Sequence, residues 1–470
     1  MQALFDPSLS FAVQALLILS LLIALGFEFV NGFHDTANAV ATVIYTNTLK
    51  PHIAVVLSGL CNFAGVFMGG IAVAMGIMQL LPVELLVSKG VGAGLAMVLA
   101  LLCSAISWNL GTWYFGLPAS SSHTLIGAII GVGVANSLTP GHKFGDGVSW
   151  GKATDIGLSL LVSPLFGFTM AALIVLAVKR YTTNIDMLKP PPKDKPPPPG
   201  TRGLLVATCA GVSFAHGSND GQKGVGLVML ILIGLVPAGF ALDMTAGPDQ
   251  LARTLKAADN ITAIVREHHD QASTKDADKA IGQLQEIHKL LENRANATEI
   301  PREDRFKLRQ DLLLADKTIN NMVKDGHLGL NEAEKKTLAT ERKALRGITD
   351  YAPTWVLVAI ALALGIGTMV GWKRIVTTVG EKIGKSHLTY AQGAAAEIVA
   401  ASTIGVSAWL GLPVSTTHVL SSGIAGTMVA QRSGLQPQTV RNIGLAWLLT
   451  LPASMILSGV FFLIFRALLV

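Results

Sequence analysis

The sequence predicts an all-α integral membrane protein, made of two related halves and a helical polar insertion. Of its 470 residues, 51% are hydrophobic and only 14% are charged, whereas soluble domains carry about 25% charged residues. Apolar runs long enough to cross a bilayer, roughly 20 residues each, recur along the chain. Two pairs of polar motifs interrupt these runs and match each other in order. We expect an inverted-topology repeat with about 10–12 transmembrane or re-entrant helices.

The apolar runs account for the membrane part of the chain. About ten of them are long enough to be read as membrane segments. The first run lacks a basic leader and has the length of a spanning helix, so we interpret it as a retained segment rather than a signal peptide. The runs lie near 11–30, 53–80, 92–115, 117–138, 155–178, 203–240, 353–372, 388–410, 413–430 and 442–466.

Two polar segments divide the chain. Residues 179–202 contain "KPPPKDKPPPPG", a proline run that behaves as a semi-rigid spacer. This linker separates the first membrane repeat, residues 1–178, from the second, residues 203–248 and 347–470. The remaining residues, 249–346, form the polar insertion inside the second repeat.

The insertion has the pattern of a small helical hairpin or bundle. Its "GHLGLNEAEKK" offers a glycine break followed by Asn331 as a helix cap. One apolar stripe at helical spacing lies among charged residues. Its members are Ile281, Leu284, Ile287 and Leu291. We interpret the segment as a structural or regulatory appendage without an active site of its own.

The basic residues outside the insertion indicate membrane orientation rather than nucleic-acid binding. They cluster in the loops 179–202 and 373–387, which is typical of cytoplasmic loops. Counting crossings from these loops places the insertion and both chain termini on the side of the membrane opposite to the cytoplasm. The two halves then begin on opposite sides of the membrane, and such inverted repeats are typical of secondary transporters.

The first pair of motifs places a carboxylate inside each half. "FVNGFHDTANAV" and "FAHGSNDGQKGV" share the pattern Phe-x-x-Gly-x-x-Asp, which ends at Asp35 and Asp220. Carboxylates within a membrane are costly, so they mark ion or proton pathways. Both aspartates are therefore candidates to hold a proton or a cation, and they disfavour a passive channel.

The residues beside these aspartates differ between the halves. Asn38 follows Asp35 by three positions and shares its helix face, whereas Lys223 occupies the matching place after Asp220. An ammonium group only donates hydrogen bonds and cannot ligate sodium. We expect Lys223 to form a salt bridge with one aspartate, with Asp35 as the first choice for the proton carrier. Further candidates around this pair are His34, His216, Asn219 and Gln222.

The second pair of motifs predicts helices that begin within the membrane zone. "GLPASSSHTLIGAIIG" (116–131) and "GLPVSTTHVLSSGIAG" (411–426) repeat Gly, Leu, Pro, Ser and His in register. Pro and hydroxyl residues suit a first helical turn, and free N–H groups there bind anions. Packing of Ser and Thr between helices is the alternative. The hydroxyl candidates are Ser120, Ser121, Ser122, Ser415, Thr416 and Thr417, and His123 and His418 are expected to pin the hairpins.

Together these four motifs resemble the inorganic phosphate transporter (PiT) family, and most of all its bacterial low-affinity, proton-coupled branch. That family carries a repeated Asn-Asp-x-Ala-Asn-type signature and repeated Pro-x-Ser-[Ser/Thr]-[Ser/Thr]-His hairpins. The sequence departs from the pattern at His34, where Asn is usual, and at Gln222-Lys223, where Ala-Asn is common. These departures argue against a sodium site. The resemblance covers both membrane halves and leaves out the insertion.

The resemblance implies a proton symporter that imports inorganic phosphate, as a neutral complex with a divalent metal, across a bacterial inner membrane. It implies that the six hydroxyls bind phosphate and that Asp35, Asn38, Asn219 and Asp220 form the coupling site. A homodimer in membrane lipid is expected, and we expect no cofactor, no fixed structural metal and no nucleic-acid partner. The alternatives are a sodium-coupled carrier, a carrier of sulfate or arsenate, and a membrane phosphohydrolase built on the pair His34-Asp35.

Overall fold

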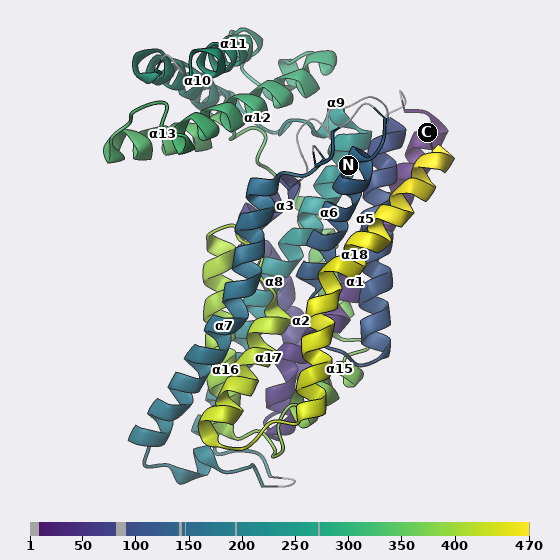
Figure 1. Cartoon of the computed structure of the whole chain (residues 1–470), viewed down its shortest axis with the longest axis vertical. Coiled ribbons are helices and arrows are strands. Elements are labelled where there is room, and N and C mark those ends of the chain that lie inside the picture. Colours follow the sequence, from purple (N-terminus) through teal and green to yellow (C-terminus); the bar gives the residue numbers. More distant parts are fainter. Residues whose placement is uncertain are drawn as a thin grey trace. The chain divides into compact units, whose positions relative to one another are not determined.

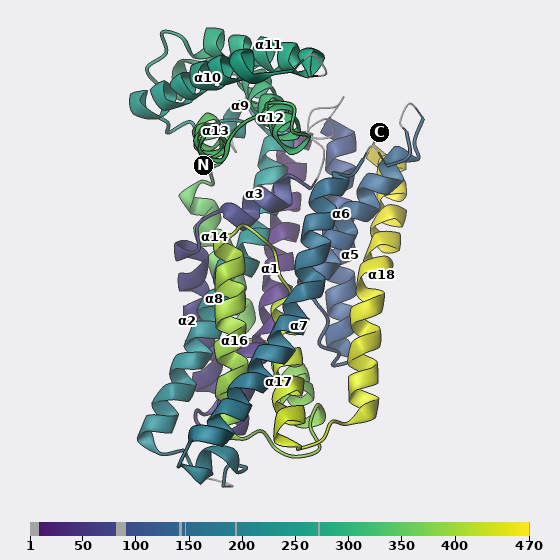
Figure 2. The same ribbon diagram turned by 60° about the vertical axis from the view of Figure 1, so that its left-hand side comes forward.

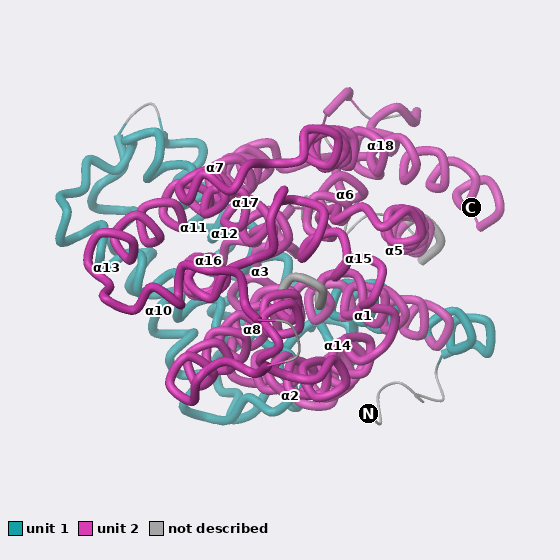
Figure 3. The backbone as a smooth tube through the Cα atoms, turned by 90° about the horizontal axis from the view of Figure 1, so that it is seen from below, with its two compact units in different colours: residues 1–17, 83–91, 229–353 teal, residues 18–82, 92–228, 354–470 magenta. Residues whose placement is uncertain are grey.

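The computed structural model describes residues 9–80, 91–140, 143–145, 147–192, 195–270 and 273–469. The regular structure in these ranges is helical, apart from one isolated β-bridge between Gly384 and Leu435. The chain forms two compact units, coloured separately in Figure 3. Unit 1 comprises residues 1–17, 83–91 and 229–353, and unit 2 comprises residues 18–82, 92–228 and 354–470.

Unit 2 is a set of long helices that run side by side (Figures 1 and 2). Each apolar run predicted from the sequence corresponds to a helix or to a broken helix, and α1 and α8 continue into unit 1. The helices are α1 (Phe11–Tyr45), α2 (Pro51–Met68), α3 (Ala72–Met78), α5 (Val91–Tyr114), α6 (Ser121–Ser137), α7 (Trp150–Tyr181), α8 (Pro199–Leu235), α14 (Thr354–Thr368), α15 (Lys373–Thr377), a π-helical turn (Thr378–Lys382), α16 (Tyr390–Trp409), α17 (Thr416–Gln431) and α18 (Pro437–Leu469).

Fewer of these helices are full spans than the apolar runs suggest. Within the described residues, five helices are long and apolar enough to cross a membrane, and six if α14 and the segment after it, bent by 55°, form one broken span. The helices α6 and α17 have only 17 and 16 residues. They are short because each begins at a hydroxyl cap rather than at the start of its apolar run.

The hairpin helices α6 and α17 pack on the long helices of the opposite halves. The helix α6 lies against α18, and α17 lies against α7. Glycines permit this close approach, because a Cβ at Gly131 would lie 2.1 Å from the carbonyl oxygen of Met455. A Cβ at Gly426 would lie 2.2 Å from that of Phe168. The reciprocal packing relates the two halves to each other.

The glycine shared by the Phe-x-x-Gly-x-x-Asp motifs has a matching role in each half. A Cβ at Gly32 on α1 would lie 2.4 Å from the carbonyl oxygen of Leu364 on α14. A Cβ at Gly217 on α8 would lie 2.1 Å from that of Asn62 on α2. Both motif helices therefore approach a neighbouring backbone directly before their aspartates, which fixes where the carboxylates stand.

The linker between the halves is shorter than residues 179–202. The helix α7 continues through Tyr181 and α8 begins at Pro199, with a 3₁₀ turn at Ile185–Leu188 between them. The prolines thus end at the first turn of α8, where Pro is tolerated.

Unit 1 contains the helices of the insertion, which share a hydrophobic core of their own. Leu284, Ile287 and Leu291 of the predicted stripe are buried in it, and Ile281 packs against it. The cap is confirmed, because Asn331 forms a capping box with Glu334 at the start of α13. The helices are α9 (Pro237–Phe240), α10 (Pro248–His268), α11 (Thr274–Leu291), α12 (Arg302–Lys324) and α13 (Glu332–Leu345), with a 3₁₀ turn at Ala297–Glu299.

The two ends of the insertion are held together. The backbone N–H of Asp243 donates to the carbonyl of Ile348 at 2.8 Å. The buried guanidinium of Arg309 donates to the carbonyls of Ala241 (2.9 Å) and Thr349 (3.1 Å). Burial lowers the pKa of Arg309 to about 10, so the side chain stays charged at neutral pH and keeps both bonds.

Candidate functional site

The candidate site lies in unit 2, where the hairpin helices begin beside the two motif aspartates. Ser120 caps α6 by accepting from the backbone N–H of His123 at 3.1 Å. Ser415 caps α17 in the same way, accepting from His418 at 3.1 Å. The predicted helix starts are therefore confirmed. Each capping oxygen accepts from the backbone, and the hydroxyls that contact the aspartates come from the following residues, Ser121 and Thr417.

Asp35 receives hydroxyl groups from both hairpins. Ser121 Oγ of α6 donates to its Oδ2 at 2.7 Å, and Thr417 Oγ1 of α17 donates to its Oδ1 at 2.6 Å. His34 Nδ1 lies 3.2 Å from the same Oδ1, and His34 Nε2 lies 3.0 Å from Thr112 Oγ1. The carboxylate is 2% exposed, so these donors replace its water. Asp35 thereby joins the two halves at one point.

Asp220 is paired instead with a permanent cation. Lys223 Nζ lies 2.7 Å from Asp220 Oδ1, and the side chains are 1% and 0% exposed. The same ammonium donates to Ser122 Oγ, which in turn donates to the carbonyl of Val414 at 2.6 Å. Ser121 Oγ also lies 3.3 Å from Asp220 Oδ2. The salt bridge expected for Lys223 is present, and its partner is Asp220.

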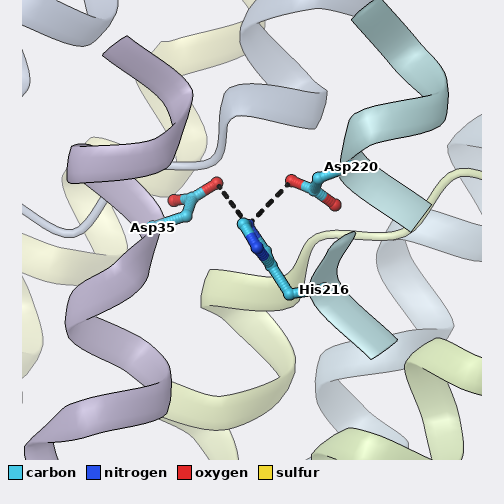
Figure 4. A group of neighbouring side chains, drawn as sticks. All are labelled: Asp35, His216 and Asp220. Carbon is cyan, nitrogen blue, oxygen red and sulfur yellow. Dashed lines mark ion pairs between the residues drawn. The ribbon is translucent and has the colours of Figure 1, made fainter. Parts of the chain in front are cut away.

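His216 stands between the two aspartates (Figure 4). Asn62 Nδ2 donates to Thr368 Oγ1 at 2.9 Å, which leaves Asn62 Oδ1 as the acceptor facing His216 Nδ1 at 2.9 Å. The hydrogen of a neutral ring is then on Nδ1. His216 Nε2 lies 3.9 Å from Asp35 Oδ2 and 3.5 Å from Asp220 Oδ2.

The side chains of Asp35, His216 and Asp220 turn hydrogen-bond acceptor atoms toward one common point. One ligand atom each from Asp35, His216 and Asp220 falls within 4.8 Å of the others. With its hydrogen on Nδ1, a neutral imidazole turns a lone pair toward two carboxylates. The arrangement could hold a small cation among the three groups. Its chemistry is that of a small cation site.

Two candidate amides brace the backbone around the site. Asn219 Nδ2 donates to the carbonyl of Leu412 at 3.1 Å, and its Oδ1 accepts from the N–H of Val414 at 3.4 Å. Gln222 Oε1 accepts from the N–H of Val73, at the start of α3, at 2.7 Å. Asn219 thus holds the segment that enters α17, and Gln222 holds the break between α2 and α3. Their contacts favour a positioning role over direct coupling.

The remaining candidates are His123 with His418, Thr416 and Asn38. The rings of His123 and His418 lie 4.5 Å apart, and His418 stacks on Trp447 at 4.0 Å, so the pair joins the two hairpins as expected. Thr416 Oγ1 is buried and, among the described residues, has no hydrogen-bond partner. The side chain of Asn38 lies outside the described residues.

Sequence reasoning missed two further buried carboxyls near these helices. Glu28 lies on α1, seven positions and so about two turns before Asp35. Glu397 lies on α16 and accepts a hydrogen bond from Thr208. Both are 0% exposed. The available signal was a single acidic residue inside an otherwise apolar run, which is unusual in a membrane segment.

The comparison with protein families decides the identity. The model described as "Phosphate transporter family" matches residues 31–458, which include both motif aspartates, Asp35 and Asp220, and both hairpins. The chain belongs to the phosphate transporter family. It is therefore a multi-pass membrane transporter and not an enzyme, and the phosphohydrolase alternative is set aside.

Relatives within the phosphate transporter family match almost the whole chain. "Low-affinity inorganic phosphate transporter PitA" of Escherichia coli K12 is 44% identical over 94% of this chain and 95% of its own length, as is PitB of the same strain. The "Probable low-affinity inorganic phosphate transporter" of Bacillus subtilis is 27% identical over 95% of the chain and 97% of its own length. A solved structure titled "The sodium-dependent phosphate transporter" aligns with a TM-score of 0.56 and 19% identity, over 97% of this chain and 100% of that one. At this identity the structure supports the fold alone.

Proposed function

We propose that the chain imports inorganic phosphate by proton symport, with phosphate carried as a neutral complex with a divalent metal ion. One observation carries the proposal: two hydroxyl-capped helix N-termini, one from each half, meet at two buried aspartates, one of which is already neutralised by lysine. The relatives named as low-affinity inorganic phosphate transporters support the same substrate.

The hairpin starts provide the phosphate donors. Free N–H groups at a helix N-terminus favour an anion, and hydroxyls beside them add donors without fixed charge. In the structure Ser121 and Thr417 donate to Asp35, while Thr416 Oγ1 is unpartnered among the described residues. An arriving phosphate would draw these hydroxyls, with Ser122, toward its own oxygens. Ser120 and Ser415 would shape the site through their caps.

The three converging acceptors provide a place for the metal of the complex. Carboxylate oxygens and an imidazole nitrogen are ligands that divalent cations accept. Asp35, His216 and Asp220 offer one such atom each. The metal would enter and leave with phosphate as cargo, so no fixed structural metal is part of the proposal.

Coupling to protons follows from Lys223. In a symmetric sodium carrier, oxygen ligands would stand near both aspartates. Here an ammonium that cannot ligate sodium contacts Asp220 at 2.7 Å. We assign Asp35, Asp220 and Lys223 to the coupling site, with Asn219 as its brace and Asn38 as a further member.

Alternating access would come from an inverted repeat of the two halves. The reciprocal packing of α6 on α18 and of α17 on α7 supports this relation. The basic loops favour a cytoplasmic linker, periplasmic termini and a periplasmic insertion. We propose a bacterial inner-membrane location and a homodimer, as the PiT resemblance implies.

Transport by the purified protein in sealed vesicles tests this function. Uptake of labelled phosphate with magnesium should follow an imposed proton gradient and stop when an uncoupler collapses it. Excess sulfate should leave uptake unchanged if the carrier is a phosphate transporter. Uptake that ignores the uncoupler and follows a sodium gradient would instead establish the sodium-coupled alternative.

A further inference from the structure

We propose that Glu28, rather than either motif aspartate, carries the coupled proton; this rests on the proton symport proposed above. Glu28 lies on α1 and is 0% exposed. Its Oε1 has no hydrogen-bond partner among the described residues, and its Oε2 accepts from Asn31 Nδ2 at 3.3 Å. One long hydrogen bond from an amide is too little to offset the cost of burying a charged carboxylate.

The motif aspartates are compensated. Asp35 accepts from two hydroxyls at 2.6 and 2.7 Å and lies beside His34. Asp220 is paired with Lys223 at 2.7 Å. An uncompensated buried charge is costly, and such a group becomes neutral instead. Of the three carboxyls, Glu28 is therefore the one that holds a proton in this conformation.

The surroundings of Glu28 suit a carboxyl that gains and loses a proton. Its charged neighbours are Lys223, which attracts the carboxylate, and Asp220 and Asp35, which repel it. On the α8 side it meets Gly224, where an added Cβ would lie 2.5 Å from Oε1. The glycine makes room for the carboxyl next to the residue that bears the ammonium.

The repeat places Glu28 and Lys223 at positions where the other half has an uncharged residue. Asp35 and Asp220 are 185 positions apart, so Glu28 matches Ser213 and Lys223 matches Asn38. Neither Glu28 nor Lys223 therefore has an acidic or basic counterpart in the other half, and the two have opposite charges. Because lysine already balances Asp220, the acid is the member free to change its charge.

The proton step is a simple exchange at one oxygen. With the carrier open to the outside, a proton from water binds Glu28 Oε1 and forms the neutral carboxylic acid. With the carrier open to the inside, the O–H bond breaks and the proton returns to water. The carboxylate left behind is stabilised by Lys223. One proton therefore crosses in each cycle that carries phosphate.

The test uses Glu28→Gln in proteoliposomes containing magnesium and labelled phosphate, with a pH dye inside. Glu28→Asp serves as the conservative variant, and Ser213→Ala, at the matching position of the other half, serves as control. Wild type and Ser213→Ala should show proton influx with phosphate. If one proton accompanies each phosphate, a gradient of one pH unit supports about tenfold accumulation.

Glu28→Gln should lose proton influx and accumulation, so that phosphate inside equals phosphate outside, while exchange of labelled for unlabelled phosphate continues. Glu28→Asp should keep coupling with a shifted pH profile, which also tests the proposal if the glutamine variant fails to fold. Unchanged proton influx in Glu28→Gln, loss of exchange in a folded variant, or an unshifted profile in Glu28→Asp would overturn it. Absence of phosphate-linked proton influx in wild type would instead remove the proposed function itself.

Discussion

Asp35 and Asp220 occupy the same place in a repeated motif, yet their carboxylates are stabilised in different ways. Asp35 is held by a hydroxyl from each hairpin, whereas Asp220 is held by the ammonium of Lys223. A hydroxyl group can rotate away from a carboxylate and donate to an arriving anion instead. A buried lysine cannot leave its carboxylate in this way, because both charges would then be buried without a partner. The first half thus offers exchangeable contacts and the second half a permanent one.

Of the changes considered, removal of the Asp35 charge should have the largest effect on phosphate uptake. Asp35→Asn cannot receive the two hydroxyls and His34 as a carboxylate does, so we expect concentrative phosphate uptake to be abolished. Exchange of labelled for unlabelled phosphate should fall with it, because Asp35 belongs to the proposed binding site and Glu28 is the proposed proton carrier. Labelled phosphate accumulation in vesicles measures the effect. Asp155→Asn, which changes an exposed residue of α7, is the matched control, and an Asp35→Asn variant that accumulates phosphate like this control would refute the prediction.

Removal of the permanent contact should destabilise the protein. Lys223→Gln leaves Asp220 buried without its cation, and breaking such a pair costs roughly 3–5 kcal/mol. Thermal unfolding of the purified protein should therefore begin at a lower temperature. The double variant Lys223→Gln/Asp220→Asn should regain much of the loss, because neither charge remains. A single variant as stable as the wild type would show that the ion pair contributes nothing.

Removal of one exchangeable donor should weaken phosphate binding without abolishing transport. A hydrogen bond to a charged group contributes about 1.5–3 kcal/mol, so Ser121→Ala or Thr416→Ala should raise the half-saturating phosphate concentration about tenfold or more. Ser137→Ala, at the far end of the helix that carries Ser121, should leave it unchanged. If both site variants keep the wild-type KM and maximal rate, the hairpins serve only packing.

Removal of the insertion should have the smallest effect, because it lies outside both motif regions. Residues 241–349 are tied at their ends by the bond from Asp243 to Ile348, so a short flexible linker can replace residues 249–346. We expect uptake to persist in the shortened carrier. Complete loss of uptake, with the protein still present in the membrane at wild-type amounts, would assign the insertion a part in transport.

The sequence predicted those features of the site that depend on local chemistry or on the repeat. The caps at Ser120 and Ser415 follow from Pro and hydroxyl residues at a helix start, and the pairing of Lys223 with Asp220 follows from helical spacing. The cap at Asn331 in the insertion is local in the same sense. Each of these contacts joins residues within four positions of one another, where periodicity alone decides which side chains meet.

Contacts between distant segments could not be predicted in this way. Ser121 and Thr417 reach Asp35 across 86 and 382 positions, and the packing of the hairpins decides that they serve this aspartate. Asn219 was expected at the coupling site, and its contacts with the backbone of Leu412 and Val414, 193 and 195 positions away, could not be predicted from the sequence. Glu28 has no counterpart in the other half, so the repeat comparison did not reveal it.

The central claim is that Lys223 takes the place of a cation beside Asp220, and one paired measurement tests it most directly. Phosphate uptake by wild type and Lys223→Asn is measured at a fixed proton gradient, with and without sodium, and normalised to the protein in the vesicles. The account predicts that wild type is indifferent to sodium and that Lys223→Asn acquires a sodium response, because an amide oxygen then stands where the ammonium stood. An identical sodium response in both proteins would contradict the claim.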